Sequence, residues 1–176
     1  MSLLTLATQE NATGKVKKIF IEIQEMLGML PNGISLWSIN PDALKEQWES
    51  IKLVLSKDID VQKLHAIIRY LVSDENQCTY CTGFNKSMLL NHYELSHEQI
   101  ASLHVDLDRA PLNNKNKALL KFAMKSVKNA DSISKKDVDE LKELEIPEVC
   151  MFNIVKAASH MYVVNTLFKT FKVQND

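Results

Sequence analysis

The stretch DENQCTYCTGFN, residues 74–85, follows one strongly apolar segment, opens another, and holds two of the chain's three cysteines. If Cys78 and Cys81 lie in the first turn of a helix, they fall on one face of it. Their sulfurs can close a disulfide where the two Cα atoms come within about 4.4–6.8 Å. Amide N–H groups at a helix start favour a thiolate, and Cys-x-x-Cys pairs often have a lowered thiol pKa. The pattern predicts a redox-active dithiol; the simpler interpretation is two buried cysteines in a helical core.

The remaining sequence predicts helices and no strand. Glycine and proline number only four each, and apolar residues recur every three or four positions over long stretches. Asn40-Pro41 predicts a helix start, because Asn caps a helix and Pro fits its first position. Ser96-x-x-Gln99 and Ser134-x-x-Asp137 predict two further starts. The expected helices span 15–27, 41–55, 60–73, 77–91, 100–103, 114–129, 134–144 and 148–169. The predicted fold class is all-α, with one domain over residues 1–176.

Charge and composition limit which binding partners and which cellular compartment we expect. The chain has 21 basic and 22 acidic residues and a net charge of −1, so electrostatics favour neither nucleic acid nor a membrane surface. No apolar run approaches about 18 residues, and the N-terminus lacks the pattern of a secretory signal. Three cysteines do not suggest a secreted disulfide framework. We expect a cytoplasmic protein, where a Cys-x-x-Cys pair is more often catalytic or metal-binding than structural.

Several motifs in order resemble a known family. They are GMLPN at 28–32, NPDAL at 40–44, LVS at 71–73, CTYC at 78–81, AA at 157–158 and Asn165. Together they resemble the alkylhydroperoxidase D-like, or carboxymuconolactone decarboxylase, superfamily, and within it the uncharacterised peroxidase-related proteins. The resemblance covers nearly the whole chain. It implies a helical bundle, a homo-oligomer (commonly a trimer or hexamer) and an antioxidant peroxidase activity.

The same resemblance assigns roles to the cysteines. It implies that Cys81 attacks a hydroperoxide and that Cys78 resolves the sulfenic acid, as in the peroxidase members. Thiolate attack gives a sulfenic acid that condenses with a neighbouring thiol to a disulfide. A thiol or dithiol reductant must then restore the pair by exchange. The expected substrate is a peroxide or a disulfide, and no cofactor beyond the cysteines is required.

Two positions depart from the family pattern. The pattern is Cys-x-x-Cys-x-x-x-His, and this chain has Asn85 in place of the His. A Glu is expected a dozen residues before the first cysteine, where this chain has Ala66. Asn85 can hydrogen-bond a thiolate or position a water, but it cannot act as a base near neutral pH. Because general acid–base help is worth about 10²–10⁴-fold, we expect a slower or redirected reaction. His65 could substitute, although an ordinary His on a helix flank is the simpler interpretation.

Three alternatives remain open on the sequence. Cys78, Cys81, His92 and His97 have a spacing close to that of a zinc site. The predicted helices separate these residues, however, so we predict no metal. Decarboxylase or lactone chemistry is disfavoured, because such members of the superfamily generally lack the cysteine pair. A non-catalytic, oligomeric helical protein with structural cysteines is the main alternative to an enzyme. Cys150 and His160 are interpreted as core residues.

Overall fold

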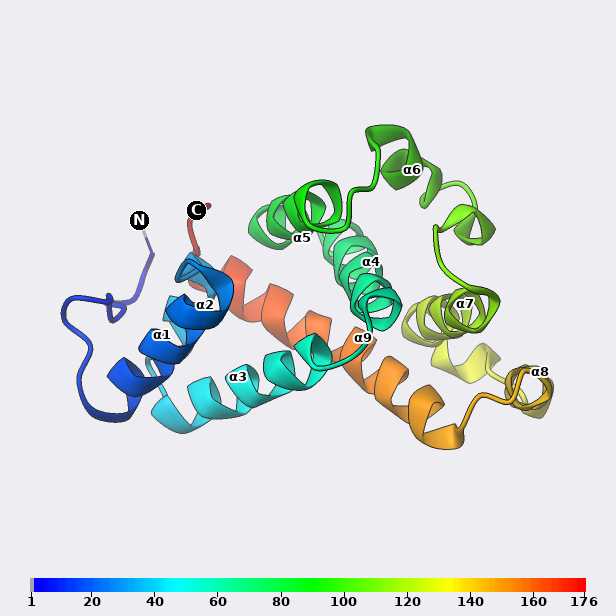
Figure 1. Ribbon diagram of the computed structural model, residues 1–176, viewed down its shortest axis with the longest axis horizontal. Helices are drawn as coiled ribbons and strands as arrows, with labels where there is room; N and C mark the ends of the chain where they lie inside the picture. Colours follow the sequence, from blue (N-terminus) through cyan, green and yellow to red (C-terminus); the bar gives the residue numbers. More distant parts are fainter. Residues whose placement is uncertain (1) are drawn as a thin grey trace. The chain divides into compact units, whose positions relative to one another are not determined.

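The computed structural model describes residues 2–176, which form helices and no strand, so the all-α prediction is confirmed (Figure 1). The longer helices lie close to their predicted ranges. The α-helices of the described chain are α1 Gly14–Leu27, α2 Asn32–Trp37, α3 Pro41–Leu55, α4 Ile59–Glu75, α5 Thr79–Asn91, α6 His97–Ser102, α7 Asn114–Lys128, α8 Lys135–Glu143 and α9 Glu148–Thr170. Two short 3₁₀ turns, η1 Leu107–Arg109 and η2 Ala130–Ser132, complete the described chain.

The helix α2 was not predicted from the sequence. Pro31, Asn32 and Gly33 suggest a turn, yet the carbonyl of Pro31 accepts hydrogen bonds from the amides of Ile34 and Ser35 and so opens a helix. Pro31 has an extended backbone and precedes the first helical residue, a place where proline costs no hydrogen bond. Ile34 and Leu36 are buried, so tertiary packing rather than local propensity selects the helix here.

The chain divides into two compact units, and each is described by itself. The first unit contains the residues up to Lys57 together with Thr166–Asp176. Phe20, Ile23, Leu44 and Trp48 form the centre of its core. Asn40 caps α3 as predicted, because its side chain accepts hydrogen bonds from the amides of Asp42 and Ala43. The prediction of a single domain over the whole chain stays a prediction.

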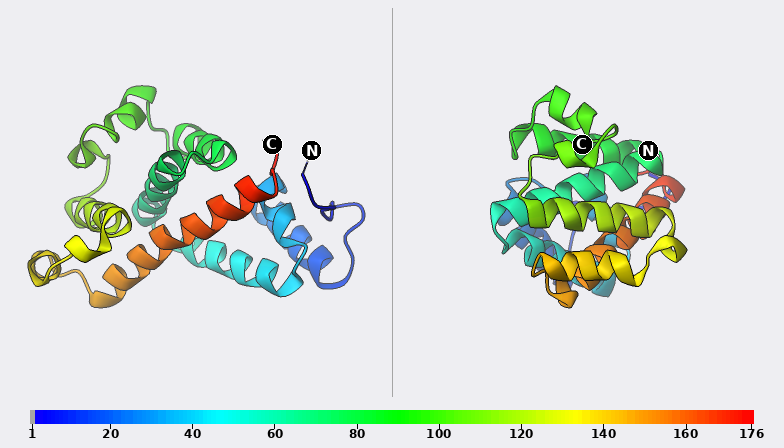
Figure 2. Two further views of the ribbon diagram at one scale, coloured as in Figure 1. Left: turned by 180° about the vertical axis from the view of Figure 1, so that it is seen from behind. Right: turned by 90° about the vertical axis from the view of Figure 1, so that its right-hand side faces the viewer.

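The second unit, Asp58–Asn165, is built around α4. In both viewing directions α4 lies between α5 and α7, and it contacts both (Figures 1 and 2). The side chain of Asp58 caps α4 by accepting hydrogen bonds from the amides of Asp60 and Val61. Ala66, Ile67 and Val72 of this helix have no exposed surface. The predicted capping boxes at Ser96 and Ser134 also form in this unit.

Only three residues connect α4 to α5. Gln77 adopts a left-handed backbone with φ 53°. Its amide donates to the carbonyl of Asp74, and the amide of Cys78 donates to the carbonyl of Ser73, both at 2.9 Å. These bonds satisfy carbonyls at the end of α4 in the way of a Schellman motif. Cys78 is thereby fixed as the N-cap of α5, and Cys81 lies in the first turn.

The final helix is apolar on two sides. In the second unit, Met151, Ile154, Ala158 and Met161 of α9 form a buried stripe with helical spacing. Phe152 is nevertheless 68% exposed, and it neighbours other exposed apolar side chains of the same helix. Within residues 2–176, no helix has the length and apolar character needed to cross a bilayer.

Gln77→Gly is expected to stabilise the protein. A left-handed backbone costs a residue with a Cβ roughly 1 kcal/mol, a cost that glycine avoids. We expect a melting temperature higher by about 2–4 °C in thermal unfolding. Lys86→Gly, at an exposed position inside α5, is the matched control and should destabilise by about 1 kcal/mol. Equal losses in both variants would show that the left-handed turn carries no strain.

Candidate active site

The cysteine pair lies where α5 begins, inside the second unit. The Sγ atoms of Cys78 and Cys81 are 2.6 Å apart and share a hydrogen bond. A disulfide bond measures about 2.04 Å, so closing it requires only a small side-chain movement. Both side chains are buried, with 1% and 3% of their surface exposed. The predicted placement of both cysteines at one helix start is therefore observed, and the two sulfurs are placed to react with each other.

The pKa of the Cys81 thiol is raised above its ordinary value. The hydrogen bond with Cys78 is the main cause, and burial and the charge of a neighbouring thiolate add to it. Interactions with the Ser73 hydroxyl and with the backbone amide of Cys81 act in the opposite direction. The neighbouring sulfur and burial therefore outweigh the helix start in setting the pKa of Cys81. Two thiolates this close repel each other, so the pair keeps a proton between its sulfurs.

Ser73 and Asn165 form a buried polar pair next to the cysteines. The Ser73 hydroxyl donates to Oδ1 of Asn165 at 3.2 Å, and both residues are essentially inaccessible to solvent. Nδ2 of Asn165 has no hydrogen-bond partner within the described residues. Ser73 also hydrogen-bonds Cys81. The sequence reading quoted both residues as part of a resemblance but gave neither a role, because their contact joins positions 92 residues apart.

Asn85 has partners other than those expected. Its Nδ2 donates to the carbonyl of Cys81 at 2.8 Å, and its Oδ1 accepts from Nε of Arg69 at 2.9 Å. Since Arg can only donate, these partners also fix which end of the amide faces which group. Neither bond goes to a sulfur, so Asn85 links the first turn of α5 to α4. Arg69 was overlooked in the sequence, although a charge within the apolar run AIIRYLV, residues 66–72, could have marked it.

No carboxylate takes the place of the expected Glu. Ala66 is fully buried in α4. Its neighbour His65 is largely enclosed, and burial, followed by the charge of Arg69, lowers the pKa of His65 to about 4. His65 is therefore neutral at pH 7 and a weaker base than an ordinary histidine. Cys150 and His160, expected in the core, are both only partly buried.

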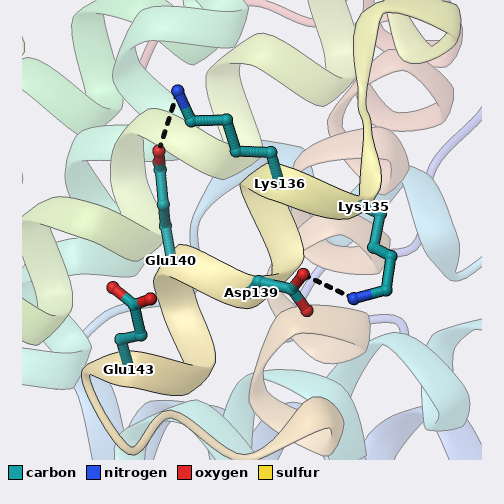
Figure 3. A pocket seen from close by; sticks show the side chains of 5 residues that line it. All are labelled: Lys135, Lys136, Asp139, Glu140 and Glu143. Atoms are coloured by element: carbon teal, nitrogen blue, oxygen red, sulfur yellow. Dashed lines mark hydrogen bonds and ion pairs between the residues drawn. The ribbon is translucent and has the colours of Figure 1, made fainter.

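In the part of the chain that the structure describes, the potential metal-ligating side chains are not clustered. Among residues 2–176, no three His, Cys, Asp or Glu side chains lie close enough together to hold a metal ion. Cys78, Cys81, His92 and His97 therefore do not form the zinc site that their spacing suggests. Figure 3 shows a depression over α8 instead, lined by five charged side chains. Two ion pairs one turn apart, Lys135–Asp139 and Lys136–Glu140, occupy it, as is usual on an exposed helix.

Comparison with solved structures identifies the fold. The chain superposes on an uncharacterised peroxidase-related protein from Ralstonia eutropha JMP134, described as an alkylhydroperoxidase AhpD core. The TM-score is 0.80 at 19% identity, over 99% of this chain and 92% of the other. An uncharacterised peroxidase-related protein from Silicibacter sp. TM1040 gives 0.80 at 20% identity with the same coverage. This chain has the AhpD-like helical fold. The fold prediction is confirmed.

A third similar structure belongs to a protein that is described as a debrominase rather than as peroxidase-related. It is a cysteine-to-alanine variant of the debrominase Bmp8 in complex with 2,3,4-tribromopyrrole. Its TM-score is 0.73 at 20% identity, over 100% of this chain and 94% of that protein. No protein-family model matches the sequence, and no curated protein matches it. The similarity therefore establishes the AhpD-like fold, and the chemistry must be argued from the site.

The raised pKa of Cys81 predicts an unusual pH profile for alkylation. In reduced protein carrying Cys150→Ser, the iodoacetamide rate at Cys81 should rise about tenfold per pH unit up to pH 9 without a plateau, because only the thiolate reacts. An unstructured cysteine peptide levels off near its pKa of about 8.5. Adding Cys78→Ser should shift the profile to lower pH, since it removes the main cause of the raised pKa. A plateau near pH 7 in the Cys150→Ser protein would contradict the prediction.

His65 predicts a loss of stability in mild acid. Its pKa falls from 6.5 to about 4 on folding, so the unfolded chain binds the extra proton between these values. Stability is therefore full above pH 6.5 and decreases toward pH 4, by about 3 kcal/mol. His65→Gln should remove this part of the pH dependence in urea unfolding. The carboxylates of the chain contribute equally to the parent protein and to the variant, so they do not affect the comparison. Parallel curves for the two proteins would show that His65 is not held neutral.

Proposed function

We propose that this protein is a thiol-dependent peroxidase whose redox centre is the Cys78–Cys81 pair. The observation that carries the proposal is the 2.6 Å separation of the two sulfurs at the start of α5. The AhpD-like fold adds support, because two structures that share it are described as peroxidase-related. Exchange of the same dithiol with a disulfide substrate is a second use of this centre.

The proposed reaction balances in three steps. The Cys81 thiolate attacks the terminal oxygen of the hydroperoxide, the O–O bond breaks, and the leaving alkoxide takes a proton to become an alcohol. The Cys78 thiol then condenses with the Cys81 sulfenic acid, which forms the disulfide and releases water. A thiol or dithiol reductant, supplied by a cytoplasmic setting, returns two electrons and two protons by exchange. The proposed catalytic residues are Cys78 and Cys81, and Asn85 is a positioning residue.

We expect the reaction to be slow at neutral pH, because the Cys81 thiol must first lose its proton. Ala66 and Asn85 supply neither an acid nor a base, and the raised pKa of Cys81 keeps its thiol protonated. The proton that must leave Cys81 has three neighbouring acceptors in this site: the Cys78 sulfur, the Ser73 hydroxyl and water that enters with the substrate. The missing general acid–base help corresponds to a rate lower by about 10²–10⁴-fold.

The main alternative is a non-catalytic helical protein with structural cysteines. The low exposure of both thiols favours it, because a substrate needs access to a sulfur. In either case we propose a homo-oligomer, a trimer or hexamer as the resemblance implies. The exposed apolar side chains of α9, Val149, Phe152, Tyr162 and Val163, would lie in such an interface.

Oxidation of the reduced protein by cumene hydroperoxide separates the two functions. The parent protein should lose two hydrogens by intact mass, at a rate that increases with pH because the Cys81 thiol must lose its proton. Cys81→Ser should abolish the reaction, and Cys78→Ser should stop it at a sulfenic acid that dimedone traps. Cys150→Ser is the matched control and should behave like the parent protein. No loss of two hydrogens, or no change in either pair variant, would favour the structural interpretation.

A further inference from the structure

Arg69 is a buried cation without a counter-charge. It lies in α4, the most enclosed helix of the second unit, and protein around its guanidinium lowers the pKa of Arg69. The side chain is only partly buried and keeps part of its surface accessible. Within the described residues it makes one hydrogen bond, to Asn85, and no ion pair with a carboxylate. A buried charge is costly unless an opposite charge and hydrogen bonds compensate it.

The groups that face this cation are neutral. His65 lies one helical turn before Arg69, on the same side of α4. Tyr93, which is 8% exposed, also interacts with the guanidinium charge. Burial raises the pKa of the Tyr93 hydroxyl, and the charge of Arg69 only partly offsets this. At neutral pH the positive charge of Arg69 therefore interacts with a neutral imidazole and a neutral phenol, and each of these can donate a hydrogen bond.

Arg69 is joined to the cysteine pair through one side chain, Asn85. Arg69 uses its Nε on Asn85, and Asn85 donates to the carbonyl of Cys81. The terminal amino groups of the guanidinium have no partner within residues 2–176. The charge acts on His65 and Tyr93, whereas Cys78, Ser73 and the backbone are the groups that act on Cys81. The free donors of Arg69 are thus available to a ligand rather than committed to the thiolate.

We propose that Arg69, flanked by His65 and Tyr93, binds a carboxylate of the substrate, which is an organic hydroperoxide that carries this carboxylate. The proposal rests on the peroxidase function and gives its substrate class. A carboxylate matches the planar fork of a guanidinium and supplies the negative charge that Arg69 lacks. Asn85 links this guanidinium to the first turn of α5, where Cys81 lies. Specificity then comes from one charged contact next to the reacting pair.

A matched pair of substrates tests the charge alone. The probes are 4-(2-hydroperoxypropan-2-yl)benzoate and its methyl ester, which share one hydroperoxide group. We expect the parent protein to prefer the acid over the ester in kcat/KM by about 10- to 100-fold, as for a charge-assisted hydrogen-bonded pair. Arg69→Gln should bring the acid-to-ester ratio close to one, and Arg69→Lys should give an intermediate ratio, because lysine keeps the charge without the fork. Arg109→Gln, at the chain's only other arginine, which is exposed, should leave the ratio unchanged.

Binding of the reaction product separates this proposal from the peroxidase function. The parent protein should bind 4-(2-hydroxypropan-2-yl)benzoate in calorimetry about tenfold or more tightly than the methyl ester of the same alcohol, and Arg69→Gln should lose this difference. Thermal unfolding confirms that each variant is folded. No oxidation by either hydroperoxide, with selective binding intact, would overturn the peroxidase function and leave the carboxylate site standing. Equal rates and equal binding for acid and ester in the parent protein would overturn the carboxylate site.

Discussion

The three-residue connection between α4 and α5 is the constraint on which the site depends. The amides of Gln77 and Cys78 satisfy carbonyls at the end of α4, so the connection cannot shift its register without leaving buried backbone groups unpaired. This fixes Cys78 as the helix cap and places Cys81 one turn into α5. Ser73, whose carbonyl accepts the Cys78 amide, has its side chain beside the same cysteines. One set of backbone hydrogen bonds thus brings the two cysteines and their polar neighbour together.

Burial determines the electrostatic character of this centre. The hydrogen bond with Cys78 and then burial raise the pKa of Cys81, and burial lowers that of His65, because a low-dielectric surrounding disfavours thiolates and charged histidine. Arg69 is the exception, because a guanidinium stays charged in a protein. The site therefore combines neutral, proton-holding groups with one permanent cation. Such an arrangement favours recognition of an anion over rapid acid–base catalysis, and it differs from the His and Glu relay that the family resemblance implies at the positions of Asn85 and Ala66.

Local patterns in the sequence predicted most of the helices but not their contacts. Asn40, Ser96 and Ser134 were identified as caps because a cap depends on neighbours within three residues. The helix α2 was missed because Pro31 and Gly33 locally favour a turn, and only the burial of Ile34 and Leu36 decides otherwise. Gln77 gave no signal, since a left-handed residue is normally predicted from glycine. The direction of the thiol pKa needed the structure, because a helix start is a local feature whereas burial is tertiary.

The sequence by itself determined the helical class, the helix starts and the pairing of Cys78 with Cys81, because these depend on spacing within a few residues. Only the tertiary structure decided what surrounds the pair. Ser73 meets Asn165, and Arg69 meets Asn85, through contacts between different helices. A sequence pattern carries no distance between such helices, and the charge and solvation of a group depend on that distance. The chemistry of the pair was therefore set by packing.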